Sequence, residues 1–251
     1  MTSSILEVRG LTKSFGALRA SDGIDLEVRE GETHAVIGPN GAGKTTLIGQ
    51  LAGEIRSDRG EVRFAGEDIT ALPAPARSRK GLARSFQITS IYPDFSTLEN
   101  VMLAVQAHAG HSFRFWRAAR EQTALRAPAR AILEELGLGG RAGVQASNLA
   151  HGEQRRLEIA MALAVRPRLM LLDEPVAGMG AEETRRMIAF LSTLKGGKTI
   201  ILVEHDMDAV FSLADRVSVL VYGRIIATGT PQEIRANPEV RRAYLGEEGP
   251  A

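Results

Sequence analysis

Apolar and polar residues alternate along two stretches near the N-terminus, Ile5–Phe15 and Gly23–Glu32. Such alternation is typical of strands with one buried and one wet face, so we expect an antiparallel pair here. Three later stretches are apolar almost throughout, which indicates strands buried on both faces of a parallel sheet. They are THAVI at 33–37, LMLL at 169–172 and the apolar part of KTIILVEHD at 198–206.

The amino-acid composition changes between Ile91 and about Val165, where helix-forming residues dominate and runs of β-branched residues disappear. We interpret this block as a helical subdomain inserted into an α/β core. The sequence therefore predicts a single α/β domain over residues 1–251, with a doubly wound core and an antiparallel front sheet. The core with its β subdomain is expected at about 1–90 and 166–251, and the helical subdomain at about 91–165.

Composition narrows the possible classes of function. The net charge of the 251 residues is +1, so no global field draws the chain to nucleic acid or acidic lipid. The absence of cysteine excludes disulfides, thiolate metal sites and thiol catalysis, and it fits a reducing compartment. The N-terminus does not resemble a secretory signal, and no stretch reaches about 18 apolar residues, so we expect any membrane association to go through a partner.

Two basic segments each allow two interpretations. Arg77, Arg79, Lys80 and Arg84 form either a phosphate or nucleic-acid patch or a solvated helix face, and the balanced charge favours the solvated face. HSFRFWRAAREQ, residues 111–122, is either a membrane-surface or partner-binding helix, or a helix that buries one aromatic face. The second interpretation is favoured in both cases.

The stretch GPNGAGKTT, residues 38–46, fits the pattern G-x-x-x-x-G-K-[ST] between a predicted strand and a helix expected at Thr46–Gly53. Glycines let the backbone wrap around phosphate, and the helix N-terminus adds positive potential. Lys44 supplies a mobile charge for the outer phosphates, and the hydroxyl of Thr45 is placed to ligate Mg2+. We therefore expect this P-loop to bind a nucleoside triphosphate with Mg2+; a glycine turn that binds nothing is the alternative.

Two of the predicted buried strands end in residues that carry chemistry. Asp173 and Glu174 follow LMLL, and His205 follows IILVE, at the strand ends where α/β sheets place their ligands. Phosphoryl transfer to water needs a phosphate cradle, Mg2+, a group that orients the water and neutralisation of the γ-phosphate. We expect Asp173 to hold Mg2+ or its waters, Glu174 to orient the water, and His205 to donate a hydrogen bond to the γ-phosphate.

Phe15 stands between the first two predicted strands, beside Gly16. An exposed aromatic side chain ahead of a P-loop can stack on a nucleotide base, because every purine presents a π face. A core phenylalanine at a strand end is the alternative, and the local sequence does not separate the two.

The order of these segments resembles that of an ATP-binding-cassette ATPase subunit. The resemblance rests on Phe15, GPNGAGKTT, Gln87, NLAHGEQRRLEIAMALA, LMLLDEP and VEHD, and it covers essentially the whole chain. It implies the fold class α/β, with a P-loop NTPase core, an antiparallel β subdomain and an inserted α-helical subdomain. It also implies that two subunits enclose two ATP molecules, with each site built from the P-loop of one chain and the signature segment of the other.

The same resemblance implies roles for individual residues. Phe15 would stack on adenine, Gln87 would sense Mg2+ and touch the permease, Glu174 would be the catalytic base, and His205 would contact the γ-phosphate. The residues expected to bind nucleotide are Phe15, Gly38, Pro39, Asn40, Gly41, Ala42, Gly43, Lys44, Thr45 and Thr46, together with Leu149, Ala150, His151, Gly152 and Glu153 of the signature segment. Those expected to hold Mg2+ are Thr45, Gln87 and Asp173.

Several further segments resemble the ATPase subunits of branched-chain amino-acid importers. They are GLARSFQ, the insert near HAGHSFRFWRAAR, EQRRLEIAMALA, EHDMDAV and the ending NPEVRRAYLG. The resemblance implies a second ATPase subunit, identical or homologous, two transmembrane permease subunits and, indirectly, a periplasmic solute-binding protein. It places the chain at the cytoplasmic face of the inner membrane. The segment PVAGM also resembles urea-importer subunits, so a urea or amide importer is the alternative.

Two positions depart from the family pattern. The signature usually begins Leu-Ser-Gly-Gly, and here it is Leu149, Ala150, His151 and Gly152. The serine hydroxyl that Ala150 lacks would have bonded the partner site's γ-phosphate, a contact worth about 1.5–3 kcal/mol. We therefore expect a weaker composite site, which works best beside a partner with a complete signature. Gly180 replaces an aspartate frequent in the family, and we attach less weight to it.

Other classes of function remain to be distinguished. A soluble ATP-dependent switch acting on nucleic acid or ribosomes usually has paired cassettes or basic arms, and this chain has one cassette and a balanced charge. A lipid or lipopolysaccharide exporter subunit is a further alternative, which the neighbouring genes would separate from an importer. A binding module that does not hydrolyse ATP is disfavoured, because Glu174 and His205 are both present.

Overall fold

The structure is a computed structural model that describes residues 3–84, 91–108 and 123–245. Its strands are β1 (Ser4–Phe15), β2 (Leu18–Arg29), β3 (Thr33–Ile37), β4 (Arg59–Phe64), β5 (Glu67–Asp68), β6 (Leu82–Arg84), β7 (Leu169–Asp173), β8 (Thr199–Val203), β9 (Arg216–Val221) and β10 (Arg224–Gly229). Its α-helices are α1 (Lys44–Ala52), α2 (Ala74–Arg79), α3 (Thr97–His108), α4 (Thr123–Glu135), α5 (His151–Ala164), α6 (Ala181–Leu194), α7 (Met207–Leu213), α8 (Pro231–Ala236) and α9 (Pro238–Val240).

Two sheets form the α/β part of the described chain. One is antiparallel in the order β2-β1-β4-β5, and the other has the order β10-β9-β3-β8-β7-β6. Strands β9, β3, β8, β7 and β6 run parallel to one another, and β10 joins as an antiparallel edge. Every residue of β3, β7 and β8 is buried, as their continuous apolar sequences predicted.

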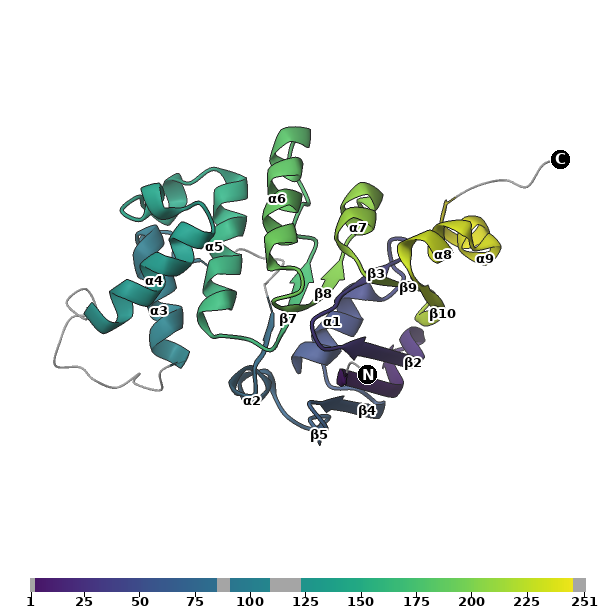
Figure 1. Ribbon diagram of the computed structural model, residues 1–251. Helices are drawn as coiled ribbons and strands as arrows, with labels where there is room; N and C mark the ends of the chain where they lie inside the picture. Colours follow the sequence, from purple (N-terminus) through teal and green to yellow (C-terminus); the bar gives the residue numbers. More distant parts are fainter. Residues whose placement is uncertain (1–2, 85–90, 109–122, 246–251) are drawn as a thin grey trace.

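Helix α1 lies between the two sheets and fills the core that they share (Figure 1). Leu47, Ile48 and Leu51 are fully buried there, in one cluster with Leu6 of β1 and Leu171 of β7. The P-loop opens this helix, so its backbone is held by a core that packs against both sheets. Such packing holds the loop in one shape, as the expected phosphate cradle requires.

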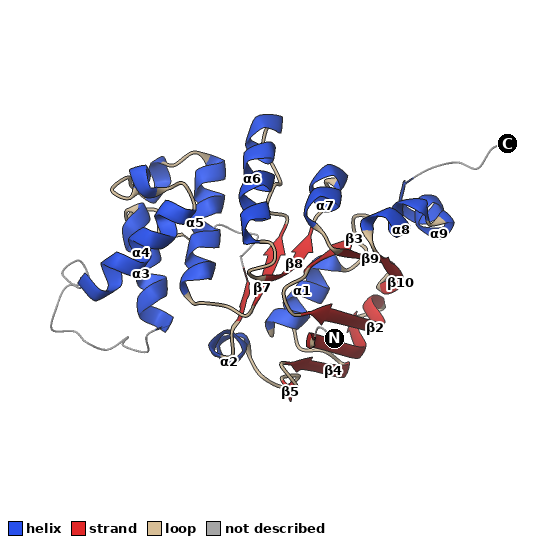
Figure 2. Ribbon diagram, viewed as in Figure 1, coloured by secondary structure: helices blue, strands red, loops and turns tan. Residues whose placement is uncertain are grey.

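The helices of the block predicted at 91–165 gather on one side of the molecule, away from the antiparallel sheet, as Figure 2 shows. Helices α3, α4 and α5 bury Val101, Leu133 and Leu157 against one another. The same hydrophobic cluster includes Leu172 of β7 and Met187 of α6. The helical block is therefore joined to the sheet through an apolar core, and not by a polar linker alone.

Most of the expected elements form, with small differences at their ends. Strands β9 and β10 form a hairpin that turns at Gly223, whose φ is positive. Phe15 is the last residue of β1 and not a loop residue, because β1 and β2 pair as far as the Phe15–Leu18 positions. The aromatic segment 111–122 lies outside the described residues. No helix within the described ranges is both long and apolar enough to cross a membrane.

Four basic residues between positions 77 and 84 were expected on a solvated helix face, and this expectation is wrong for two of them. Arg77 is 3% exposed, and its guanidinium donates hydrogen bonds to the carbonyls of Gln50 and Leu51 at the end of α1. These bonds satisfy helix-terminal carbonyls that have no partner within the helix. Arg84 is also largely buried, with carboxylates as partners. Balanced net charge describes the whole surface, and it could not reveal that these arginines turn inward.

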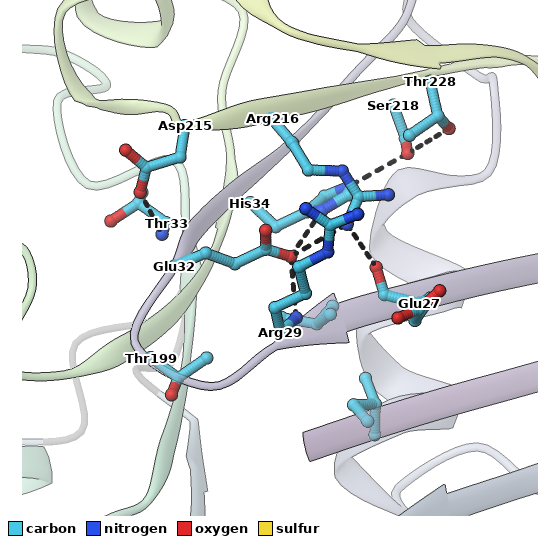
Figure 3. Close-up of polar contacts among 12 residues, drawn as sticks. Glu27, Arg29, Glu32, Thr33, His34, Thr199, Asp215, Arg216, Ser218 and Thr228 are labelled. Atoms are coloured by element: carbon cyan, nitrogen blue, oxygen red, sulfur yellow. Dashed lines mark hydrogen bonds and ion pairs between the residues drawn. The ribbon is translucent and has the colours of Figure 1, made fainter. Parts of the chain in front are cut away.

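A buried polar cluster joins the first residues of β3 to β9 and β10 (Figure 3). His34 contacts Glu32 through Nδ1 at 3.2 Å and Ser218 through Nε2 at 2.8 Å. Glu32 also accepts hydrogen bonds from the Arg29 N–H at 2.8 Å and from Arg216 at 3.3 Å. The cluster lies at the opposite end of β3 from the P-loop, so we assign it a role in fixing the strands.

Candidate functional site

Two glycines of the P-loop stand where backbone from other strands comes too close for any side chain. A Cβ on Gly38 would lie 2.1 Å from the carbonyl oxygen of Leu220, and one on Gly43 would lie 2.1 Å from that of Ala20. The neighbouring Ala42 carbonyl accepts a hydrogen bond from the N–H of Gly223. The loop is thus held by β2 and by the β9–β10 turn, which lie far from it in sequence.

Lys44 turns its side chain back toward the first residues of the P-loop. Its side chain is 7% exposed, and Nζ donates to the carbonyl oxygens of Gly38 at 2.6 Å and Pro39 at 3.1 Å. Burial lowers the pKa of Lys44, and the nearby charges of Glu174 and Asp173 act in the opposite direction. The charge of the ammonium therefore interacts with both carboxylates at the end of β7. Thr45, the next residue, is exposed at the start of α1.

Asp173 ends β7 as a buried carboxylate that is 1% exposed. Its Oδ2 accepts a hydrogen bond from Arg84 Nη2 at 3.0 Å. Burial raises the pKa of Asp173 above its ordinary value, although the charge and hydrogen bond of Arg84 lower it. Oxygen donors from one hydroxyl and one carboxylate are the ligands that Mg2+ prefers, so Thr45 and Asp173 fit that metal.

Glu174 has a positive backbone φ of 49°, which is uncommon for a residue with a side chain. Its N–H donates to the carbonyl of Val203 in β8, which anchors the turn. The carboxylate reaches His205, with Oε1 3.6 Å from Nδ1. The side chain of His205 is 54% exposed, so this imidazole faces outward from the end of β8. The structure thus brings Lys44, Asp173, Glu174 and His205 to one edge of the parallel sheet.

Glu204 holds the backbone of this edge in place, a role that was not predicted from the sequence. It is fully buried, and its Oε1 accepts a hydrogen bond from the N–H of Val176. Its Oε2 accepts from the N–H groups of His205 and Asp206. Burial raises the pKa of Glu204, although these three N–H groups oppose the rise. A charged residue just before a strand-end histidine was the only available signal of this role.

Phe15 is 50% exposed, so it is not a core residue. The ammonium of Lys13 lies 5.4 Å from the centroid of its ring, and Lys13 is itself held by Asp58 at 2.8 Å. One aromatic face is therefore available at the end of β1. Gln87, the other residue expected near the nucleotide, lies outside the described residues.

The signature segment forms the N-terminus of α5, with Leu149 buried and Ala150 as the N-cap. Glu153 accepts the Ala150 N–H at 3.0 Å, but Ala150 has no side-chain oxygen to complete a capping box. Glu183 of α6 accepts the Gly152 N–H at 2.8 Å. The signature segment therefore forms a second centre, distinct from the P-loop edge of the sheet. It lines a cavity of about 260 Å³ together with Arg141.

Another cavity, of about 490 Å³, opens between the helical block and the core. We name it the α2–α5 cavity. Apolar side chains from α2, α3 and α5 line it, among them Pro75, Ala104 and Met161, and Glu54 and Arg84 lie on its wall. The cavity therefore adjoins the residue that bonds Asp173.

Comparison with known proteins decides the family. The profile of the ABC transporter family matches residues 21–177, and that of the branched-chain amino acid ATP-binding cassette transporter matches residues 224–250. The chain belongs to the ABC transporter family. Its fold is that of an ABC ATPase, and it is an ATPase subunit of a transporter.

Three curated relatives of this ABC ATPase match it along all or nearly all of their length. The high-affinity branched-chain amino acid transport ATP-binding protein BraF of Pseudomonas aeruginosa is 41% identical, over 98% of this chain and 100% of its own. The corresponding protein LivG of Escherichia coli is 38% identical over the same shares. An archaeal LivG, from Archaeoglobus fulgidus, is 36% identical over 96% of this chain and 95% of its own.

Solved structures agree with the fold of this ABC ATPase. The ADP conformation of MJ1267, an ATP-binding cassette of an ABC transporter, has a TM-score of 0.86 and 29% identity, over 98% of this chain and 100% of that one. A nucleotide-free ATP-binding cassette from an ABC transporter has a TM-score of 0.85 and 28% identity, with the same coverage. The dimeric cassette MJ0796 bound to ADP and Pi, at 24% identity and a TM-score of 0.75 over 90% of this chain and 98% of its own, supports the fold alone.

Proposed function

We propose that this ABC ATPase hydrolyses ATP with Mg2+ to drive a branched-chain amino-acid importer. The observation that carries the chemistry is the meeting of Lys44, Asp173, Glu174 and His205 at the carboxyl edge of the parallel sheet. The solute is supported by the full-length similarity to BraF and LivG, whose names give branched-chain amino acids.

The side chains divide the chemistry among them. Lys44 neutralises the outer phosphates, and Phe15 offers an aromatic face to adenine. Glu174 orients the attacking water, held in place by its anchored turn. His205 donates a hydrogen bond toward the γ-phosphate. Mg2+, when bound by Thr45 and Asp173, would stabilise charge on the phosphate oxygens.

A second subunit completes each site in this proposal. The N-terminus of α5, with the N–H groups of Ala150 and Gly152, supplies positive potential to the ATP held by the partner. Both N–H groups are now bonded by carboxylates, so their exchange for a phosphate accompanies closure. Two permease subunits dock at the α2–α5 cavity, and this docking holds the ATPase at the cytoplasmic face of the inner membrane.

Purification of the ATPase with its two permease subunits and a solute-binding protein tests the proposal. In vesicles, leucine, isoleucine or valine should stimulate ATP hydrolysis in the wild type and leave the Lys44→Ala variant inactive. Stimulation by urea, with none by the three amino acids, would support the urea-importer alternative. Stimulation by lipid without a binding protein would support an exporter.

A further inference from the structure

Arg84 holds two carboxylates that belong to different parts of the molecule. Its Nη2 donates to Asp173 Oδ2 at 3.0 Å, and its Nη1 donates to Glu54 Oε2. The side chain is 10% exposed, and its Nε is buried without a hydrogen-bond partner among the described residues. Among the described residues, these two acids hold the guanidinium between them.

Asp173 is the end of this bridge that belongs to the nucleotide site. It is almost fully buried and carries the carboxylate that the proposed function assigns to Mg2+. A guanidinium bonded to one of its oxygens takes a lone pair that a divalent cation also uses, and the two positive charges repel each other. Arg84 and Mg2+ therefore oppose each other at this carboxylate.

Glu54 is the end of the bridge that faces the α2–α5 cavity. It follows α1, and its side chain is 32% exposed. Both Glu54 and Arg84 line that cavity, with Tyr92 and Glu158 among its other polar residues. Anything that enters the cavity and attracts the Glu54 carboxylate changes the charge that Arg84 faces on this side.

We propose that Arg84 is a positioning residue that competes with Mg2+ for Asp173, and that Glu54 weakens this competition by drawing the guanidinium toward the cavity. The proposal rests on the role of Asp173 in the proposed function. It gives a physical link from the α2–α5 cavity to the carboxylate assigned to Mg2+, because one guanidinium bonds both Glu54, which lines the cavity, and Asp173. Occupation of the cavity would thereby tune the affinity for Mg2+ with nucleotide.

Substitutions of Arg84 and of Glu54 should shift the Mg2+ concentration needed for nucleotide binding in opposite directions. In the full-length chain, binding of a fluorescent ATP analogue is titrated with Mg2+ to obtain the half-saturating Mg2+ concentration. Arg84→Gln removes the competitor and should lower that concentration by roughly three- to tenfold. Glu54→Gln leaves the guanidinium to Asp173 alone and should raise it by a similar factor. Arg84→Lys retains the charge and should stay close to the wild type.

The exposed pair Arg63–Glu61 provides charge-matched controls. It is joined at 2.9 Å on β4, and the side chains are 41% and 37% exposed. Arg63→Gln and Glu61→Gln should leave the Mg2+ dependence unchanged. A merely structural role for Arg84 and Glu54 would weaken binding in both variants, and that result, or no shift in either, would overturn the proposal. If Arg84→Gln does not fold, the rise expected for Glu54→Gln decides alone.

A further variant separates failure of this inference from failure of the proposed function. Asp173→Asn should abolish the Mg2+ dependence of analogue binding. If the dependence persists in Asp173→Asn, the metal role assigned to Asp173 is wrong and the inference falls with it. If it disappears, while Arg84→Gln and Glu54→Gln do not shift it oppositely, only the competition is disproved.

Discussion

At the scale of single residues, neighbouring positions on one strand end receive different environments. Asp173 completes β7 and is buried against Arg84, whereas Glu174 turns away in a left-handed backbone conformation and meets His205. A non-glycine residue in this conformation costs of order 1–3 kcal/mol and persists only where its surroundings fix it. Here the Val203 carbonyl holds the N–H of Glu174. The strained turn thus gives the two neighbouring acids different surroundings, as their proposed roles at Mg2+ and at the attacking water require.

Substitution of Glu174 tests the assignment of the base. We expect Glu174→Gln to bind ATP normally and to lower turnover by at least two decades, which corresponds to about 2.7 kcal/mol of barrier. Steady-state ATPase assays and nucleotide titration of the assembled transporter measure the two effects. Glu182→Gln, an exposed change on α6, should retain activity. Substantial residual hydrolysis in Glu174→Gln would point to another base.

At the scale of elements, α5 begins without the side-chain cap that its sequence position invites. Ala150 has the extended backbone of an N-cap, with φ of −62° and ψ of 155°, and Glu153 supplies only half of a capping box. Glu183 compensates from α6 by accepting the Gly152 N–H. The helix terminus that is proposed to face the partner's ATP is therefore held by acidic side chains of its own subunit.

Restoring the serine should act on both folding and catalysis. Ala150→Ser should raise the free energy of unfolding by about 0.5–2 kcal/mol, because a hydroxyl can accept the N–H of residue 153. It should also increase ATPase activity in the assembled transporter, if the signature makes a weak composite site. Chemical denaturation and steady-state assays measure the two quantities. Equal ATPase rates for the variant and wild type would contradict the weak-site hypothesis.

The buried cluster that joins β3 to β9 should make stability depend on pH. Burial raises the pKa of Glu32, but the hydrogen bonds from His34 and the Arg29 N–H together lower it by more. The net shift of the pKa is therefore downward. A lowered folded-state pKa stabilises the fold above the unfolded value, and this contribution is lost as pH falls through the folded value. Stability from Glu32 is therefore complete at neutral pH and declines below about pH 4.5.

Glu32→Gln isolates that contribution. At pH 7 the variant should be less stable by about 1–3 kcal/mol, since the Arg29 N–H and Arg216 lose a charged acceptor. The difference should shrink as pH falls below about 4.5. Urea denaturation across this range measures it, with Glu30→Gln as an exposed control. A difference that stays constant with pH would show that the ionised carboxylate does not stabilise the fold.

At the scale of the whole molecule, the parts of the site lie in two centres of one chain. The P-loop edge gathers Lys44 and the acids of β7, whereas the signature segment contacts Glu183 and Arg141. Both centres belong to the same ABC ATPase, and the proposed sandwich joins each one to the other centre of a second subunit. This arrangement predicts that ATP converts the monomer into a dimer of twice its mass.

A variant that binds ATP but does not hydrolyse it should stabilise this dimer and so tests the arrangement directly. The Glu174→Gln variant with ATP should elute at twice the subunit mass, and it should return to the monomer when ATP is removed. Adding Lys44→Ala should prevent the shift, because the outer phosphates lose their cation. Size-exclusion chromatography with light scattering measures the masses. A monomer at saturating ATP would contradict self-association and favour a different partner subunit.

The buried strands, the P-loop and the order of the functional segments could all be predicted from the sequence alone, and so could the family that the comparisons confirmed. These features are local or repeat with the period of a strand or helix, so neighbouring residues suffice to indicate them. The folded chain was needed to find that Arg77 and Arg84 turn inward, that Glu204 holds the strand ends, and that Glu183 caps α5. Each depends on a partner far along the chain. The packing of the sheets and helices brings these groups together, and no local pattern encodes that meeting.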